Sequence, residues 1–196
     1  MNNPVFSEIL VDQIFPSFLA SAKLEYDNDS LKKEIYNETK LDQSVNVSNQ
    51  GGYHSSTFCS DKEYDFTHLK TLEKSVMKFA DYYLEKHGHT SRTSDCTWWI
   101  NINQQDNYNS LHHHYRTDMI AVFYFDVPSE DSGDFVIMRN DGSTYTKLYD
   151  YNEFVIKPVT GRVYLMPGHM WHHVTPNKNP NNQKRVSISY NINVSR

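Results

Sequence analysis

The chain has 196 residues, of which 38% are hydrophobic and 14% aromatic, and its formal net charge is −5. This length and aromatic content are typical of one folded domain with a substantial core and argue against disorder. The negative charge argues against a nucleic-acid binder that relies on a basic surface. No apolar run approaches the ~18 residues needed to span a membrane.

Two cysteines, Cys59 and Cys96, are too few for a disulfide scaffold or a four-cysteine zinc site. The first residues, Met1 to Pro4, lack the basic and apolar stretches of a signal peptide. We therefore expect two free thiols and a cytoplasmic location.

Residues 1–94 are expected to form a helical and β support region packed on the rest of the chain. Apolar residues favour a strand over 5–11 and a helix over 14–19, and residues 44–60 read as a loop. Asp29 and Ser30 are expected to cap a short helix. The clearest helix covers residues 66–86, because its apolar residues form one stripe of period 3.6 and Gly88 can end it.

After residue 94 the apolar pattern changes to a period of two. It predicts strands over residues 96–103, 119–127, 134–138, 153–156, 162–166 and 186–194. Many short strands separated by turn residues indicate a sandwich, barrel or jelly roll. We expect residues 95–196 to form a β core flanked by the N-terminal helical layer, as one structural domain. The aromatic N-terminal layer could also form a homodimer face.

Six of the ten histidines lie in two short segments. In the first, His112 and His114 share one face of an extended chain and His113 points the opposite way. Two imidazoles on one face make half of a site for iron, zinc, copper or nickel. A solvated, histidine-rich loop is the simpler alternative.

The second histidine segment, residues 167–176, contains His169, His172 and His173. A third imidazole from this segment could complete a facial metal site with open positions. Alternatively, Trp171 and one histidine pack under the loop. This alternative explains one histidine but not both segments together.

The last predicted strand alternates strictly between apolar and polar residues. Its polar face, which includes Arg185 and Ser187, either meets solvent or lines the interior of a barrel. In the second case, Arg185 offers a planar fork to a carboxylate, with the Ser187 hydroxyl on the same face.

The order of these elements carries more information than any one of them. His-x-His is followed after 60 residues (172 − 112) by a further His, and after 13 more (185 − 172) by Arg-x-Ser. This order resembles the Fe(II)- and 2-oxoglutarate-dependent oxygenases. More narrowly, it resembles a small bacterial and phage group distantly similar to prolyl hydroxylases. The resemblance extends over roughly residues 50–194 and is carried by residues 51–55, 99–103, 109–114, 122–128, 167–176 and 185–192.

The resemblance implies a mainly β fold, the double-stranded β-helix, which is a cupin-like jelly roll. It implies Fe(II), 2-oxoglutarate as cosubstrate, and O2. It places the metal ligands at His112, His114 and His172. The usual second ligand of the superfamily is a carboxylate, so His114 is a departure from that pattern. The open alternatives are Asp118 or the remoter Asp106 as a carboxylate ligand, His113 and His173 as ligands one residue away, and His169 in a supporting role.

The resemblance also implies how the cosubstrate is bound. It implies that Arg185 and Tyr124 bind the far carboxylate of 2-oxoglutarate, with Ser187 beside Arg185. The implied reaction hydroxylates an unidentified substrate, either a small molecule or a peptide, while 2-oxoglutarate is decarboxylated to succinate. The substrate opening could be walled by Trp98 or Trp99, Tyr108 and Tyr115.

Two other functions compete with the oxygenase. One is a non-catalytic jelly-roll module that binds a ligand and keeps a structural or vestigial metal. The other is a cupin-type metalloenzyme that uses no 2-oxoglutarate. The pair Arg185 and Ser187 disfavours the cupin-type enzyme, because such an enzyme needs no clamp for a distant carboxylate.

Overall fold

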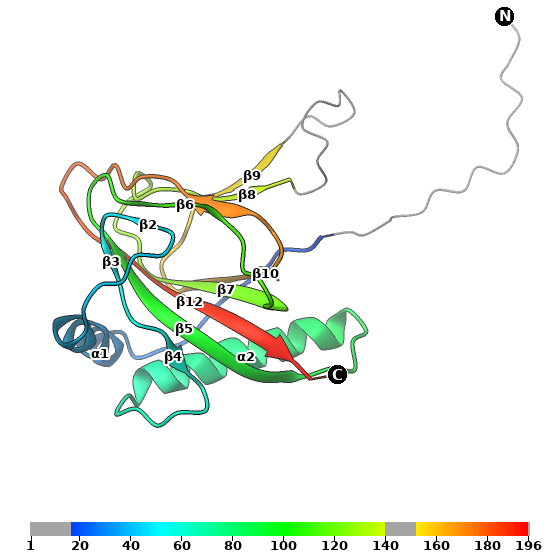
Figure 1. The fold of residues 1–196 in the computed structure, drawn as a ribbon. Helices are drawn as coiled ribbons and strands as arrows, with labels where there is room; N and C mark the ends of the chain where they lie inside the picture. Colours follow the sequence, from blue (N-terminus) through cyan, green and yellow to red (C-terminus); the bar gives the residue numbers. More distant parts are fainter. Residues whose placement is uncertain (1–16, 140–151, 196) are drawn as a thin grey trace, which may run out of the picture.

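The computed structural model describes residues 17–139 and 152–195. Two antiparallel β-sheets lie one above the other, and two helices cover the outer face of the lower sheet (Figure 1). The mainly β jelly roll predicted from the sequence is therefore confirmed, as is its flanking layer of helices.

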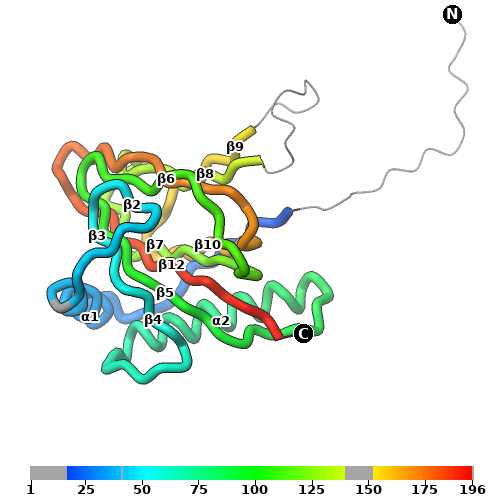
Figure 2. The backbone as a smooth tube through the Cα atoms, viewed as in Figure 1, coloured from blue at the N-terminus to red at the C-terminus, as the bar shows by residue number. Residues whose placement is uncertain are grey.

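The larger sheet lies between the smaller sheet and the helices (Figure 1), and it contains the longest strands. Its order is β1 (Ala20–Lys23), β10 (Arg162–Pro167), β7 (Met119–Asp126), β12 (Arg185–Val194), β5 (Thr93–Asn103) and β3 (Tyr53–His54), with β4 (Phe58–Cys59) also paired to β5. The last strand, β12, lies in the middle of this sheet between β7 and β5 (Figure 2). Each predicted strand that falls in this sheet is present.

The smaller sheet forms the roof. Its order is β2 (Asn49–Gln50), β6 (Tyr108–His112), β11 (His172–Val174), β8 (Phe135–Met138) and β9 (Glu153–Ile156). The strands β6 and β11 were not predicted, because both are short, rich in polar residues and without alternation. The predicted loop over 44–60 is also partly wrong, since it contains β2, β3 and β4. Pairing with longer neighbouring strands, rather than local pattern, holds these short segments extended.

The two helices are α1 (Asn28–Leu41) and α2 (His68–Lys86). The predicted helix over 66–86 is confirmed, and Gly88 takes the left-handed conformation with a φ of 76°. The cap predicted for the first helix is displaced, because the N-cap is Asp27, whose carboxylate accepts from the Ser30 backbone N–H at 3.1 Å.

The start of α2 is capped by the other helix. Thr67 at its N-cap makes no capping bond with its own side chain. Instead, the Glu34 carboxylate of α1 accepts from the backbone N–H groups of Thr67, His68 and Leu69 at 2.8–2.9 Å. A negative charge at a helix N-terminus is stabilising, so this contact joins the two helices into one layer.

The start of the chain differs from the sequence prediction. The strand predicted over 5–11 lies outside the described residues. The helix predicted over 14–19 is wrong in its described part, because residues 17–19 are irregular and lead into β1, whose backbone pairs with β10. Main-chain pairing at the sheet edge overrides the helical spacing of the apolar residues.

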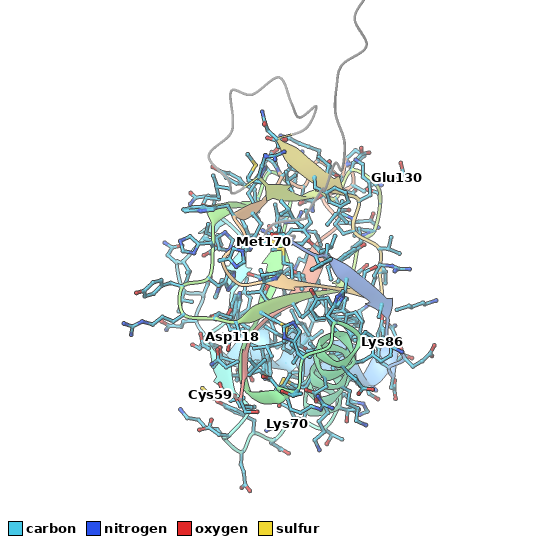
Figure 3. The ribbon with its side chains drawn as sticks, turned by 90° about the vertical axis from the view of Figure 1, so that its right-hand side faces the viewer. Cys59, Lys70, Lys86, Asp118, Glu130 and Met170 are labelled. Carbon is cyan, nitrogen blue, oxygen red and sulfur yellow. The ribbon has the colours of Figure 1, made fainter. Side chains whose placement is uncertain are left out.

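Buried apolar side chains form two separate cores, one on each side of the larger sheet. Figure 3 draws the side chains together with the ribbon. The first lies between this sheet and the helices, and the second lies between the two sheets. Strand β7 supplies apolar side chains to both cores, which explains its unbroken apolar sequence. Strand β12 supplies apolar side chains to the helix-side core and polar ones to the space between the sheets.

The N-terminal region contributes β1, β3 and β4 to the larger sheet and β2 to the smaller one. The boundary between a support region (1–94) and a core (95–196) stays a prediction. None of the helices in the described part of the chain combines the length and apolarity needed to cross a membrane.

Candidate active site

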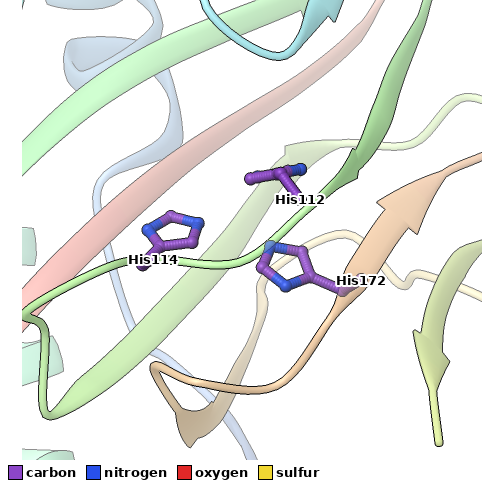
Figure 4. A group of neighbouring side chains, drawn as sticks. All are labelled: His112, His114 and His172. Carbon is purple, nitrogen blue, oxygen red and sulfur yellow. The ribbon is translucent and has the colours of Figure 1, made fainter. Parts of the chain in front are cut away.

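Three histidines meet in the space between the two sheets (Figure 4). His112 is the last residue of β6, His172 is the first of β11, and the two lie opposite each other in the sheet. His114 follows two residues after β6 ends. One ring nitrogen from each histidine lies within 4.8 Å of those of the other two, so a single ion could contact all three.

The hydrogen bonds of these rings determine which nitrogen is free. His112 Nδ1 contacts the Ser110 carbonyl oxygen at 2.7 Å, and His172 Nδ1 contacts the Met170 carbonyl oxygen at 2.8 Å. His114 Nδ1 contacts Asn191 Oδ1. A carbonyl oxygen can only accept, so each Nδ1 carries the proton and donates it. Each Nε2 then keeps a free lone pair, as a metal ligand requires.

Burial also keeps these imidazoles uncharged. Desolvation lowers the pKa of His114 to about 4 and that of His172 to about 3, and it lowers the pKa of His112 as well. All three rings are therefore neutral at pH 7. Neutral imidazole is the form that binds a metal ion.

An arginine lines the same cavity. Arg185 begins β12 and is only 1% exposed. Its Nη1 donates to the Ser132 carbonyl oxygen at 2.6 Å and to the Thr175 carbonyl oxygen at 3.4 Å. Its Nη2 is buried and has no hydrogen-bond partner in the described part of the chain. The charge of a buried guanidinium is costly unless an anion pairs with it.

A tyrosine adds a second donor near this arginine. Tyr124 on β7 lies opposite Ser187 of β12, and its buried hydroxyl also has no hydrogen-bond partner among the described residues. Burial raises the pKa of Tyr124 above its ordinary value, so the hydroxyl keeps its proton and can donate it. The donors of Arg185 and Tyr124 match the needs of a carboxylate.

A glycine makes room for the arginine. Gly133 has a φ of +94°, a conformation that side chains disfavour. A Cβ atom there would lie 2.3 Å from Arg185 Nη1 and 2.4 Å from the Thr175 carbonyl oxygen. The turn before β8 therefore requires glycine at this position.

One cavity is lined both by the histidine group and by the donors of Arg185 and Tyr124. Its walls come from both sheets and include Trp99, Asn101, His112, His114, Tyr124, His172, Arg185, Ser187 and Ser189. The polar face of β12 therefore lines the interior rather than meeting solvent. A keto acid with two carboxylates could contact the imidazole end with one terminus and the guanidinium with the other.

The alternative ligands considered from the sequence lie elsewhere. Asp118 is exposed, and its carboxylate accepts from the Val194 backbone N–H at 3.0 Å. Asp106 is also exposed and pairs with Lys178. The His113 ring contacts Trp171, with ring centroids 4.5 Å apart. The described residues that could hold an ion together are His112, His114 and His172.

The aromatic residues proposed for the substrate opening separate into different environments. Trp98 is buried in the helix-side core, where its indole N–H donates to the Glu73 carboxylate at 2.9 Å. Trp99 faces the other way and stacks on His114, with ring centroids 5.7 Å apart. Tyr115 is 77% exposed and borders a second pocket, of about 230 Å³, beside the histidines. Trp99 and Tyr115 border this pocket, whereas Trp98 does not.

Sequence reasoning did not identify Asn191 as part of the site. The alternation of β12 does place it on the same face as Arg185, Ser187 and Ser189. That face could therefore have been searched for a partner to the histidines. The backbone carbonyls of Ser110 and Met170 carry no signal in the sequence, because any residue type supplies one.

Comparison with known proteins supports the same interpretation. Residues 97–191 match the model of a family described as "Putative 2OG-Fe(II) oxygenase". No curated protein matches the chain in sequence.

Several solved structures share the fold at low sequence identity. A prolyl-4-hydroxylase from Pseudomonas putida aligns with a TM-score of 0.63 at 13% identity, over 89% of this chain and 91% of that one. A prolyl hydroxylase from Trichoplax adhaerens, bound to a hypoxia-inducible-factor peptide, aligns with a TM-score of 0.64 at 13% identity, over 89% and 82%. A viral collagen prolyl hydroxylase from Paramecium bursaria Chlorella virus-1, in complex with 2-oxoglutarate, gives 0.55 at 11% identity, over 91% and 96%.

The family match covers β5 through most of β12, the segment that supplies the three histidines, Tyr124 and Arg185. Members of this family use Fe(II), 2-oxoglutarate and O2. This match, together with the shared fold, supports membership of the chain in the 2-oxoglutarate- and Fe(II)-dependent oxygenase superfamily.

Proposed function

We propose that this protein is a dioxygenase that hydroxylates a substrate while converting 2-oxoglutarate to succinate and carbon dioxide. The observation that carries the proposal is one cavity lined both by three neutral imidazoles and by a buried guanidinium whose Nη2 has no hydrogen-bond partner among the described residues. A structural metal alone does not explain the buried guanidinium, whereas a bound carboxylate does.

His112, His114 and His172 would hold the iron through their Nε2 atoms. Fe(II), once bound with 2-oxoglutarate and O2, supplies the oxidising chemistry that protein side chains lack. The three rings present neutral lone pairs from one side, because their Nδ1 atoms are engaged elsewhere.

Arg185 and Tyr124 would bind the far carboxylate of 2-oxoglutarate, with the Ser187 hydroxyl beside them. The guanidinium is held by two backbone carbonyls, so it keeps its orientation before the cosubstrate arrives. A carboxylate there would pair with Nη2 and with the Tyr124 hydroxyl, both of which lack partners in the described part of the chain. Such charge-assisted hydrogen bonds are stronger than neutral ones.

The second pocket would receive the substrate. Its lining includes His54, Thr57, Trp99, His113, Tyr115 and Asn191, together with two of the three histidines of the metal group. Trp99, His112 and His114 line both this pocket and the cavity that contains Arg185. One similar structure carries a bound peptide, so a peptidyl substrate and a small molecule are both candidates. The cytoplasmic location and the homodimer stay predictions.

Steady-state turnover tests this proposal. Wild-type protein with Fe(II), O2 and labelled 2-oxoglutarate should release succinate, even slowly without the substrate. Replacing Arg185 by Ala should raise the KM for 2-oxoglutarate by roughly 10- to 100-fold, because hydrogen bonds to a charged group are lost. The variant Arg185→Lys keeps the positive charge but loses the planar guanidinium. Its KM for 2-oxoglutarate should lie between those of the wild type and Arg185→Ala.

Arg162→Ala is the matched control, because Arg162 lies on the same sheet and bonds the exposed Ser21 hydroxyl at 3.0 Å. Its KM should equal that of the wild type. An unchanged KM in Arg185→Ala would remove Arg185 from the site. Metal binding without any succinate would favour the non-catalytic module.

A further inference from the structure

The three histidines are oriented by two different kinds of partner. His112 and His172 each bond a backbone carbonyl two residues earlier in their own segment. His114 instead bonds a side chain 77 residues away in the sequence. The orientation of His114 alone therefore depends on the identity of a distant residue.

The position of His114 explains why it needs such a partner. His112 and His172 are strand residues, whereas His114 lies beyond the end of β6. Its backbone N–H donates to the Gly168 carbonyl oxygen at 2.9 Å, which fixes the chain but not the ring. One face of the ring packs on Trp99. Stacking limits the tilt of an imidazole but does not select which nitrogen carries the proton.

Asn191 supplies what the stacking does not. It lies near the middle of β12, opposite Ile120 of β7 and Thr97 of β5, so its backbone is held on both sides. Its side chain lies on the face of β12 that lines the cavity, and its Oδ1 accepts from His114 Nδ1. A fixed acceptor on a central strand is suited to hold a ring in one orientation.

We propose that Asn191 is the positioning residue that makes His114 a competent metal ligand, by fixing its tautomer and aiming its Nε2 at the ion. This rests on the proposed role of His114 in the metal site. Asn191 does not touch the ion itself. Outer partners of this kind contribute to metal affinity by orienting the ligand.

The amide also sets the charge of the site. All three ring partners are neutral oxygens: two backbone carbonyls and one amide. None withdraws a proton from its imidazole, so all three rings would reach an ion as neutral ligands. A carboxylate at residue 191 would keep the acceptor but add a negative charge beside His114, strengthening it as a ligand.

Metal affinity and ring tautomer test the proposal without relying on turnover. We would titrate Co(II) into metal-free protein and follow its visible absorption. The variant Asn191→Leu keeps the approximate size but removes the acceptor. Its Co(II) affinity should fall by roughly 10- to 100-fold. Asn191→Asp should retain at least the wild-type affinity, because the acceptor is preserved.

Asn193→Leu is the matched control. Asn193 lies two residues further along β12 and bonds the exposed Asp95 carboxylate at 2.9 Å, away from the histidines. Its loss should leave Co(II) affinity unchanged. Circular dichroism would verify folding, and Asn191→Ala would replace the leucine variant if that fails to fold.

Nitrogen-15 NMR of the metal-free protein gives an independent readout. In the wild type, His114 should show a protonated Nδ1 and a bare Nε2, and Asn191→Leu should show a mixture of tautomers. Wild-type affinity in Asn191→Leu, or an equal loss in Asn191→Asp, would overturn the proposal. If His172→Ala does not weaken Co(II) binding, the metal site and the proposed function fail, whatever Asn191 does.

Discussion

The two faces of β12 differ in what they contribute to the molecule. One face packs into the core between the larger sheet and the helices, through Val186, Ile188, Tyr190 and Ile192. Arg185, Ser187, Ser189 and Asn191 face the space between the sheets, where they line the two cavities beside the histidines. One strand therefore provides stability on one face and chemistry on the other, and substitutions on the two faces should have separable effects.

The largest difference in stability loss should be between substitutions of two neighbouring residues on opposite faces of β12. Ile188 is completely buried in the helix-side core, so Ile188→Ala should lower the free energy of unfolding by about 2–5 kcal/mol. Ser189→Ala should cost about 1 kcal/mol, since it removes one hydrogen bond from Asn101. Urea denaturation measures both. Equal losses in the two variants would contradict the division of the strand.

The turn at Gly133, which packs against Arg185, offers a sharper test of the face of β12 that lines the cavity. Gly133→Ala places a Cβ against Arg185 Nη1 and against a backbone carbonyl, in a conformation that side chains disfavour. We expect a loss of about 1–3 kcal/mol in stability and a raised KM for 2-oxoglutarate. Gly88→Ala is the control, because it also has a positive φ but no atom lies within 4 Å of the added Cβ. Backbone strain should lower the stability of Gly88→Ala, but its KM for 2-oxoglutarate should stay unchanged.

A further effect on stability is expected at alkaline pH, from Cys96 in the core between the larger sheet and the helices. Burial, with the nearby Glu73 carboxylate, raises the pKa of the Cys96 thiol from 9.0 to about 12. The unfolded chain loses this proton near pH 9, whereas the folded chain keeps it until about pH 12. Stability from this group is therefore complete below pH 9 and is lost as the pH rises towards 12.

The variant Cys96→Ala isolates that contribution. Between pH 9.5 and 11, wild-type stability should fall more steeply than that of the variant, by up to about 1.4 kcal/mol per pH unit. Denaturation at several pH values measures the two slopes. Parallel slopes would show that the thiol does not titrate differently in the folded and unfolded chains.

The sequence predicted the parts of this fold that have a strong local pattern. The helix of residues 66–86 and the strand of residues 186–194 show clear periodicity, because each has one face in a large core. Strand β7 was instead recognisable as a short, unbroken apolar run, because both of its faces are buried. The short strands β6 and β11 lack such a pattern, yet they carry His112 and His172. Their pairing, which places the two histidines opposite each other, depends on contacts between distant segments.

The candidate site divides in the same way. The groups of histidines and the final Arg-x-Ser were visible because their spacing matches a family with a known chemical order. The partner of His114 was not visible, because one asparagine on a polar strand face carries no distinguishing signal. Neither was the need for Gly133, which depends on the fold bringing a turn against the Arg185 guanidinium.

The most direct test is an anaerobic crystal structure with Fe(II) and 2-oxoglutarate. We expect one metal ion bonded to Nε2 of His112, His114 and His172, with the far carboxylate of the keto acid on Arg185 and Tyr124. A metal held by other side chains, or a cosubstrate whose far carboxylate does not meet Arg185, would contradict this expectation.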